Sequence, residues 1–514
     1  MRFDSPCHDG SRRNFLKSTA MVAAAACLPP GIRAAPEPAK RHRLVGIQVG
    51  AVSFLDEGTE QVLDILQERG AVNTLFLSTF SYGRGTQGRQ VQREPLPDHG
   101  KQEYDLTFHG GNYAMPHAKY YTGTSLKQTK APDYSDYDLL ADVVPRAHRR
   151  GMKVYAFYED RFREGIPGMA DLREVDWQGQ RANYMLCPLH PDYREFLLGL
   201  TRDYCESYDI DGVMWGSERQ GPLHNAISAE SKQGIVDDRA RVGCFCKFHE
   251  QAARARGIDV ARAKEGFGKL DQFIRAAQEG HRPNDGYFVT FWRLLLDYPE
   301  LMAWEKLWTD GKHALYGEIY HAAKQSRREV QVGFHLWGLN SVSPFFRAEQ
   351  NYAEFAKVAD FLKIPVYNTV AGPRYAEAID KISSTIFRDV PKDEVLDLYH
   401  SLLGYGSEAK LDQLPRAGLS TDYVNREVRR ALAGVSATNC KIYAGIGIDI
   451  PPTGREVAAP SADLSRSTPA KVTASTVAAL NAGAEGIIFS RKYSEMRLAN
   501  LSAGGKAVRD FLPG

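Results

Sequence analysis

The sequence predicts an α/β protein: a single (β/α)8 barrel with long loop insertions after strands 2 and 4. Short apolar runs typical of buried strands alternate with helical segments along the chain. Eight such alternations occur in order, and right-handed β-α units in that number close into a barrel. A doubly wound sheet is the alternative, but no Gly-x-Gly-x-x-Gly pattern opens a helix after the first predicted strand.

The predicted elements run from residue 44 to residue 490. The strands cover 44–52, 72–79, 153–158, a run that starts at Asp211, 330–337, 360–366, 441–448 and 485–490. Helices are predicted at 59–69, 137–150, 191–208, 287–323, 350–358, 393–403, 424–434 and 469–481. Gly151 supplies a C-cap for the second helix, and a His-Pro-Asp step suits the start of the third. A loop rich in Gly, His and Tyr extends to about Asp133, and a charged helical insertion spans about 220–283.

Residues 1–40 are predicted to be an export signal rather than part of the barrel domain, which then covers 41–514. Ser-Arg-Arg-Asn-Phe-Leu-Lys at 11–17 is a twin-arginine pattern, and a short apolar run follows at 20–28. The alternative is a disordered tail with accidental arginines. The order of the features favours the twin-arginine export machinery as a partner, and a periplasmic or secreted protein.

The charge balance excludes some function classes. The signal segment removes six basic and three acidic side chains, so the formal charge of +2 becomes about −1. A near-neutral chain has no electrostatic reason to bind nucleic acid or an anionic membrane surface. No later segment is long and apolar enough to form a transmembrane segment.

Glu218 is the first candidate for catalysis. The stretch from Asp211 to Glu218 is predicted to be a buried strand that delivers this carboxylate to its C-terminal end. Catalytic groups of parallel barrels collect at that end of the strands. A carboxylate at the rim, paired with Arg219 or another loop arginine, is the alternative interpretation.

Three segments resemble the glycoside-hydrolase-like TIM barrels, over most of residues 44–513. They are Tyr-Asp-Ile-Asp-Gly-Val at 208–213 followed by Glu218, the strand and its exit at 359–368, and Gly-Ala-Glu-Gly-Ile-Ile-Phe-Ser at 483–490. The resemblance implies a glycosidase with an acid/base glutamate at position 218. In the large retaining clan an Asn precedes that Glu, and here Ser217 takes its place. Met214 and Gly216 likewise replace the two internal acids of the chitinase-like Asp-Gly-x-Asp-x-Asp-x-Glu pattern.

Glycoside hydrolysis needs a second carboxylate to stabilise or attack the anomeric carbon. The resemblance implies Asp449, at the end of strand 7, where retaining members carry a Glu nucleophile. Glu159 and Asp160 at the end of strand 3 are alternative acids, which could also bind sugar hydroxyls or pair with Arg161 and Arg163. Glu495, after strand 8, is a third candidate.

Further residues at or near strand ends suit contacts with a sugar, because hydroxyls need planar hydrogen-bond partners and the CH face of a sugar packs on aromatic rings. These predicted substrate-binding residues, besides Glu159 and Asp160, are Trp215, His335, Trp337, Tyr367, Asn368 and Arg374.

Five cysteines remain after the signal, so at least one thiol of a monomer is unpaired or ligating. Cys244, Cys246 and His249 offer ligand types at short spacing, with His224, Asp237 and Asp238 upstream. A zinc site would need a fourth ligand in a tetrahedral arrangement. A structural thiol pair or an inert loop is the favoured interpretation, and neither a metal nor another cofactor is predicted.

These observations predict an exported glycoside hydrolase that cleaves O-glycosidic bonds of an oligo- or polysaccharide carbohydrate substrate with Glu218 and Asp449. A catalytically silent carbohydrate-binding barrel is the alternative, favoured by Ser217 before the Glu and by Asp in place of Glu on strand 7. A metal-dependent hydrolase, based on the Cys-x-Cys-x-x-His segment and His335, is a third hypothesis.

Overall fold

The computed structural model describes residues 43–511, except 82–86, 93, 105–108, 128, 161–165, 229–242 and 452–463 and the side chains of 183 and 184. The predicted signal and four residues named above, Arg161, Arg163, Asp237 and Asp238, lie outside the described residues.

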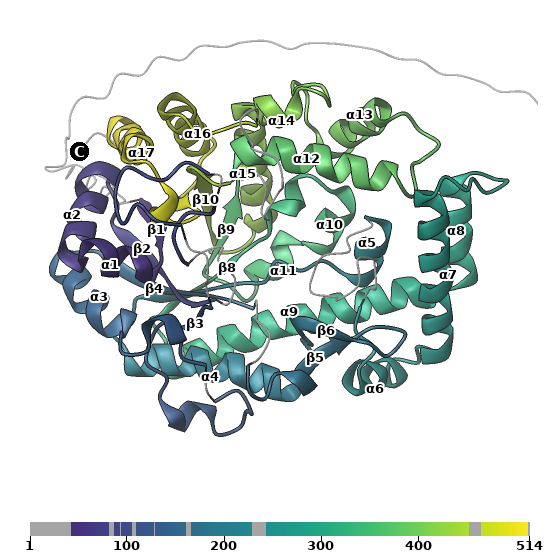
Figure 1. Cartoon of the computed structure of the whole chain (residues 1–514), viewed down its shortest axis with the longest axis horizontal. Coiled ribbons are helices and arrows are strands. Elements are labelled where there is room, and N and C mark those ends of the chain that lie inside the picture. Colours follow the sequence, from purple (N-terminus) through teal and green to yellow (C-terminus); the bar gives the residue numbers. More distant parts are fainter. Residues whose placement is uncertain are drawn as a thin grey trace, which may run out of the picture. The chain divides into compact units, whose positions relative to one another are not determined.

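Eight parallel strands form a closed barrel (Figure 1). In barrel order they are β1 (Leu44–Val49), β2 (Thr74–Ser81), β4 (Lys153–Glu159), β7 (Gly212–Gly216), β8 (Gln331–His335), β9 (Phe361–Pro365), β10 (Lys441–Gly447) and β11 (Gly486–Ser490). The barrel closes because β1 pairs with both β2 and β11. The predicted (β/α)8 fold is therefore confirmed.

Helices connect the strands on the outside of the barrel. The described helices outside the insertion after β7 are α1 (Ala51–Glu57), α2 (Thr59–Gly70), α3 (Leu139–Arg149), α4 (Pro191–Ser207), α9 (Glu300–Ser326), α10 (Pro344–Glu349), α11 (Tyr352–Ala356), α12 (Asn368–Ser383), α13 (Lys392–Leu403), α14 (Leu414–Ala417), α15 (Thr421–Val435), α16 (Pro469–Asn481) and α17 (Leu498–Phe511). Short 3-10 turns occupy Ala118–Tyr121, Pro132–Tyr134, Ala170–Leu172, Gly338–Ser341 and Tyr493–Glu495. None of the described helices combines the length and apolar character needed to cross a bilayer.

Several elements differ from the prediction. The first strand ends at Val49 rather than at residue 52, because the extended Gly50 is the N-cap of α1. Helices α10, α12, α14 and α17 were not predicted. In α12, Gly372 and Pro373 look like helix breakers, but a Cβ on Gly372 would lie 2.3 Å from the Leu414 carbonyl oxygen. That glycine permits close packing of α12 against α14, which sequence propensity does not show.

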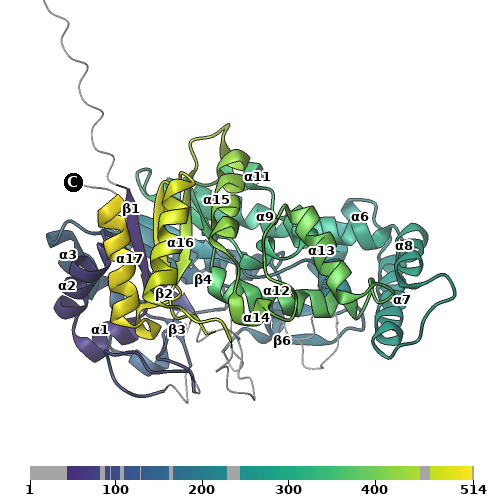
Figure 2. The same ribbon diagram turned by 90° about the horizontal axis from the view of Figure 1, so that it is seen from above.

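Two insertions lie near the C-terminal ends of neighbouring strands. After β4, the antiparallel hairpin β5 (Arg173–Val175) and β6 (Arg181–Leu186) was not predicted. After β7 come α5 (Pro222–Ile227), α6 (Lys247–Ala255), α7 (Val260–Gln278) and α8 (Tyr287–Asp297). Helices α5 to α8 pack against the long α9, and Figures 1 and 2 show α6, α7 and α8 at one side of the barrel. A further two-residue strand, β3 (Gly111–Asn112), pairs with the end of β2.

The barrel interior is filled by side chains from alternate positions of the strands. They form one buried cluster: Phe76, Tyr155, Phe157, Met214, Phe361, Tyr443 and Ile488. Gly333 makes room in it, since a Cβ there would lie 2.2 Å from the ring of Phe361. Because side chains alternate along a strand, the interior face continues upward from these residues at every second position. This alternation decides which residues at the strand ends enter the barrel mouth.

Candidate active site

Glu218 lies just beyond β7, in register with the interior residue Met214, at the C-terminal end of the barrel. Its side chain is 30% exposed, and its Oε1 lies 3.3 Å from Nε2 of His335 at the end of β8. Burial, followed by repulsion from Lys363, lowers the pKa of His335 to about 4. The imidazole is therefore neutral at neutral pH, and its Nε2–H donates to the carboxylate.

Glu159 is the second carboxylate on the interior face. It ends β4, two positions after the interior residue Phe157, and β4 pairs directly with β7 through Glu159 and Gly216. Its Oε2 accepts a hydrogen bond from Ser81 Oγ at the end of β2, at 3.1 Å. Two neighbouring strands thus deliver Glu159 and Glu218 to the same mouth.

Lys363 lies within β9, and its side chain interacts electrostatically with both carboxylates. The side chain is fully buried, and its Nζ donates to Gln48 Oε1 on β1 and, at 3.0 Å, to the Tyr367 hydroxyl. Burial lowers the pKa of Lys363 to about 7, although Glu218 and Glu159 both act to raise it. A lysine within an apolar strand was a sequence signal for this site that the prediction missed.

The glycines of β10 provide the space that Lys363 and Tyr367 occupy. A Cβ on Gly445 would lie 3.0 Å from Lys363 Cε and 3.1 Å from Tyr367 Cε1. A Cβ on Gly447 would lie 3.1 Å from Tyr367 Cβ. The Gly-Ile-Gly sequence at the end of β10 therefore shapes the mouth without contributing a functional group.

Two arginines add positive charge around Glu218. Burial lowers the pKa of Arg374 on α12, and the attraction of Glu218 opposes that shift. Burial also acts to lower the pKa of Arg491, after β11, but attraction by Glu495, Glu218 and Glu159 raises it overall. Glu495 is fully buried in ion pairs with Arg491 and Lys492, so it supports the arginine rather than lining the mouth.

Asp160 faces away from Glu159, because consecutive residues of a strand point to opposite faces. It is 2% exposed and accepts hydrogen bonds from Ser217 Oγ at 2.8 Å and from Arg219 at 3.4 Å. Arg219 also pairs with Glu174 at 2.7 Å. The structure thus places Asp160 and Arg219 in a buried ion pair behind the strand ends, and the arginine that was predicted as a partner for Glu218 binds Asp160 and Glu174.

Of the aromatic and amide residues predicted to contact a sugar, some are packed behind the strands or bound within the protein, and others lie at the barrel mouth. Trp215 is 1% exposed and packs on Tyr316 of α9, with the ring centroids 4.6 Å apart, so it belongs to the layer between barrel and helices. Asn368 donates to the Leu419 carbonyl and accepts from Ser475. Trp337 and Tyr367 are partly exposed and continue the interior register of β8 and β9, so they lie where a ligand in the mouth would touch them.

Asp449 binds residues at the start of α17. Its carboxylate accepts hydrogen bonds from the Arg497 backbone N–H at 2.9 Å, from the Arg497 guanidinium at 2.8 Å and from Asn500 Nδ2 at 2.9 Å. These partners precede or begin α17, and Asp449 itself has a left-handed backbone with φ 49°. The carboxylate therefore fixes the start of a helix, although its register on β10 matches the interior face.

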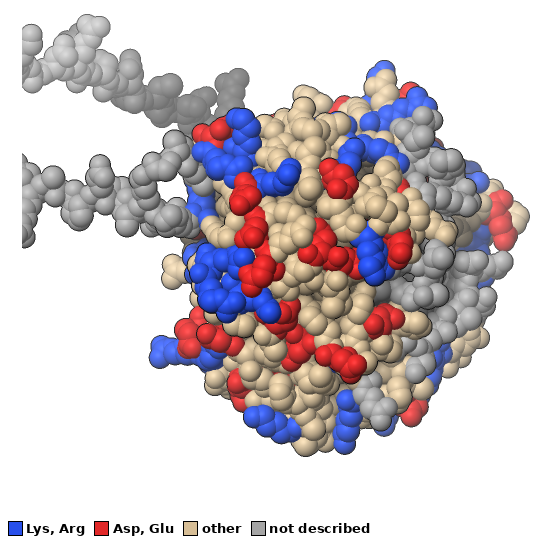
Figure 3. Space-filling model, turned by 60° about the vertical axis from the view of Figure 1, so that its left-hand side comes forward, with Lys and Arg blue, Asp and Glu red and all other residues tan. Residues whose placement is uncertain are grey.

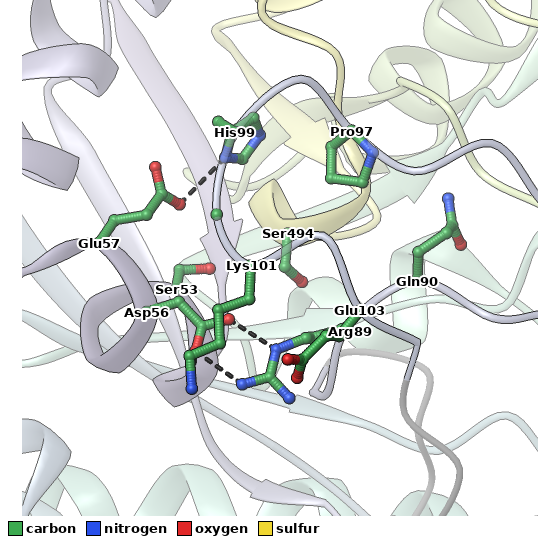
Figure 4. A pocket seen from close by; sticks show the side chains of 11 residues that line it. Ser53, Asp56, Glu57, Arg89, Gln90, Pro97, His99, Lys101, Glu103 and Ser494 are labelled. Carbon is green, nitrogen blue, oxygen red and sulfur yellow. Dashed lines mark hydrogen bonds and ion pairs between the residues drawn. The ribbon is translucent and has the colours of Figure 1, made fainter.

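A shallow hollow lies beside the mouth, between α1, the loop at 87–104 and Ser494 (Figure 4). Arg89 pairs with Asp56 at 2.6 Å, and His99 lies between Glu57, at 3.0 Å, and the Met496 carbonyl oxygen, at 2.8 Å. These ion pairs attach the loop to the barrel, and the groups in them are already compensated. The residues of this hollow therefore anchor the loop to the barrel and do not form a second candidate site.

Basic and acidic side chains are interspersed on the face shown in Figure 3. The described residues on this face form no continuous basic area of the kind that would follow a nucleic-acid backbone. The prediction that nucleic acid is not a partner stays a prediction.

A separate cluster offers ligands for a metal ion. Cys244, Cys246 and His249, which the sequence singled out, are joined by Cys187 from the end of the β5–β6 hairpin. The sequence did not indicate Cys187, because it lies far from the other three along the chain. His335, by contrast, contacts Glu218 in the barrel mouth.

Fold and site together define a (β/α)8 barrel with a charged mouth at the C-terminal ends of its strands. A family model for the TAT (twin-arginine translocation) pathway signal sequence matches residues 11–29. The chain therefore carries a twin-arginine export signal, as predicted, and is a periplasmic or secreted protein. A comparison with curated proteins found no match.

Solved structures similar to this chain include enzymes that act on glycosides. One is α-L-fucosidase isoenzyme 2 from Paenibacillus thiaminolyticus, with 13% identity and a TM-score of 0.46 over 91% of this chain and 49% of that one. Another is a β-galactosidase from Halorubrum lacusprofundi, with 13% identity and a TM-score of 0.49 over 91% of this chain and 58% of that one. A third is the PgaB (BpsB) glycoside hydrolase domain from Bordetella bronchiseptica, with 11% identity and a TM-score of 0.47 over 91% of this chain and 99% of that one. The chain spans about half the length of the first two. Their activities belong to those proteins, and the barrel described here rests on its own strand pairing.

Proposed function

We propose that this protein is an exported glycoside hydrolase in which Glu218 is the proton donor and Glu159 is the second carboxylate. One observation carries the proposal: adjacent barrel strands place both side chains on the interior face at the C-terminal mouth. Glycoside hydrolysis uses such a pair, because one group must protonate the leaving oxygen while the other stabilises or attacks the anomeric carbon.

Glu218 suits the role of acid because its carboxyl group is partly exposed and is held by His335. The neutral imidazole orients the carboxyl group, which is partly exposed at the mouth where the departing oxygen of the substrate would lie. Proton transfer needs the two heavy atoms within hydrogen-bond distance, and a fixed carboxyl orientation favours that geometry.

Glu159 suits the role of the ionised partner. Ser81 donates a hydrogen bond to it at 3.1 Å, and the positive charge of Arg491 attracts it. The ionised form of a carboxylate is the one that stabilises an oxocarbenium-like transition state.

We propose Glu159 in place of Asp449 because the Asp449 carboxylate already binds Arg497 and Asn500. A nucleophile with both oxygens bound in this way would have to break a partly buried ion pair before each attack. Trp337 and Tyr367 are proposed to contact the sugar, through CH–aromatic packing and a hydroxyl hydrogen bond respectively.

The second candidate is a catalytically silent carbohydrate-binding barrel. The contacts of Asp449 support it, because they leave strand β10 without a carboxylate free for catalysis. In that case Glu218 and Glu159 would bind sugar hydroxyls without reacting.

The test is hydrolysis of a panel of aryl glycosides and soluble polysaccharides by the mature protein, beside Glu218→Gln and Glu159→Gln. Glu318→Gln on α9, a carboxylate paired with Arg194 and 39% exposed, is the matched control. Loss of a general acid or base lowers kcat by about 10²- to 10⁴-fold. We expect such a loss in both mouth variants and wild-type activity in the control.

Addition of azide separates the two roles. If the enzyme is retaining, azide should restore turnover of an activated aryl glycoside in the truncated variants Glu159→Ala and Glu218→Ala. The glycosyl azide product should have inverted anomeric configuration with Glu159→Ala, which lacks the nucleophile, and retained configuration with Glu218→Ala, which lacks the acid/base. Full activity of Glu159→Gln would refute its assignment. Saturable sugar binding without hydrolysis on any substrate would favour the silent barrel.

A further inference from the structure

Four potential metal ligands from two distant segments meet beside the barrel. Cys187 directly follows β6. Cys244 and Cys246 precede α6, and His249 lies in its first turn, within the insertion after β7. The ligand atoms of Cys187, Cys244, Cys246 and His249 all lie within 4.8 Å of one another. Cys187, Cys244 and His249 are fully buried.

Their separations match the edges of a metal tetrahedron. Cys187 Sγ lies 3.5 Å from Cys246 Sγ and 3.2 Å from His249 Nδ1, and Cys246 Sγ lies 3.7 Å from the same nitrogen. Zinc bonds of about 2.3 Å to sulfur and about 2.0–2.1 Å to nitrogen imply tetrahedral edges of about 3.8 Å for S···S and about 3.6 Å for S···N. A single ion at the centre would therefore reach all four ligands with little movement.

We propose that these four residues bind one structural Zn²⁺ ion. Three thiolates and one imidazole are soft and borderline ligands, which select zinc over the hard oxygen-preferring cations. On binding, the three thiols release their protons to solvent, and neutral His249 provides the Nδ1 lone pair. The protein fills all four positions, so the ion has no open site for water or substrate. That coordination argues for a structural role rather than the metal-dependent hydrolase considered from the sequence.

The ion joins the hairpin after β4 to the helical insertion after β7. Cys187 belongs to the hairpin, and its backbone N–H donates to the Leu172 carbonyl. The Phe245 N–H, between the two insertion cysteines, donates to the Val175 carbonyl of β5 at 2.6 Å. The Phe245 ring also stacks on Trp304 of α9, with centroids 4.2 Å apart. The zinc thus links two segments, the hairpin and the insertion, that backbone hydrogen bonds and ring packing already hold together.

The residues next to the metal site also contact the segment that carries Glu218. Leu186, immediately before Cys187, accepts a hydrogen bond of 2.8 Å from Arg219 Nη2. Arg219 follows Glu218 directly and is 3% exposed. The metal site therefore supports the backbone of the barrel mouth from behind, through Leu186 and Arg219.

The export route fits a thiolate site. Closely spaced free thiols form disulfides in an oxidising compartment, whereas twin-arginine export carries proteins that have already folded in the reducing cytoplasm. Zinc bound there would occupy the three thiolates before the protein meets oxidants. The structure predicts that the exported protein retains reduced Cys187, Cys244 and Cys246.

The experiment measures the metal content of the exported protein. The full chain is expressed with its signal and with a tag free of histidine. The exported protein is then purified from the periplasm without chelators and analysed by elemental mass spectrometry. We expect about one zinc per chain in the wild type and about none in Cys246→Ser and His249→Ala. His249→Cys should retain the metal, because a fourth thiolate satisfies the same tetrahedron.

Cys205→Ser and Cys440→Ser are the matched controls, since both cysteines are buried but lie outside the cluster. They should keep about one zinc per chain. Where a cluster variant does not fold, the wild type decides: modification of its thiols should release zinc, and cobalt substitution should give the absorption bands of a tetrahedral thiolate site. Wild type without metal, with free thiols or a Cys187–Cys246 disulfide, would overturn the proposal. Iron in place of zinc would overturn the assignment of the ion.

Discussion

Replacing Lys363 by Met should change how the stability of the protein depends on pH. The fully buried amine has its pKa lowered by burial from 10.5 to about 7. Below about pH 7, the folded state must hold a buried ammonium that the unfolded state exposes to water. A difference between 10.5 and about 7 corresponds to about 5 kcal/mol of destabilisation.

The sign follows from proton binding. Between about pH 7 and about pH 10, the unfolded chain keeps the lysine proton and the folded chain does not, so wild-type stability rises with pH relative to the variant. Methionine has no proton to exchange, but it leaves Gln48 Oε1 and the Tyr367 hydroxyl without their donor. Loss of the donor costs about 1–3 kcal/mol at the buried Gln48, and less at the partly exposed Tyr367. That second effect does not vary over the same range.

The assay is urea unfolding of both proteins at about pH 7, 8.5 and 10. We expect the free energy of unfolding of Lys363→Met, minus that of wild type, to fall by about 4 kcal/mol over this range. Lys441→Met, an exposed lysine at the opposite end of the barrel, is the control and should show no such trend. A difference that stays constant across the range would refute the lowered pKa of Lys363.

Two further substitutions test neighbouring groups. Asp449→Asn can keep the left-handed backbone but removes the charge bound by Arg497, so we expect a loss of about 2 kcal/mol in stability and little change in kcat. A collapse of kcat with unchanged stability would instead make Asp449 the reacting carboxylate. His335→Gln removes an imidazole whose pKa is lowered from 6.5 to about 4. As pH falls from about 6.5 to about 4, the unfolded chain binds a proton at His335 and the folded chain does not, so this residue lowers wild-type stability by about 3 kcal/mol over that range. Thermal unfolding should therefore show a smaller loss of stability on acidification in the variant than in wild type, and equal acid sensitivity would contradict the assigned pKa.

Strand order and the position of the mouth were predictable because they depend on local patterns. Apolar runs marked all eight barrel strands, and Glu218 and Glu159 could be placed at strand ends by counting from those runs. Helix α12 and the β5–β6 hairpin could not be predicted in this way. The first depends on contact between Gly372 and the backbone of α14, and the second is a short pair of strands outside the β-α alternation.

The sequence by itself determined the barrel, the export signal and the set of residues from which the site is drawn. The tertiary structure decided which of those residues meet. Alternation along each strand sends Glu159 inward and Asp160 outward, and it leaves Trp215 against α9 while Trp337 keeps the interior register. Closure of the barrel brings Gln48 and Lys363 together across 315 residues, and packing of the insertion brings Cys187 to Cys246. Such meetings depend on side-chain direction and long-range packing, which a pattern of neighbouring residues does not encode.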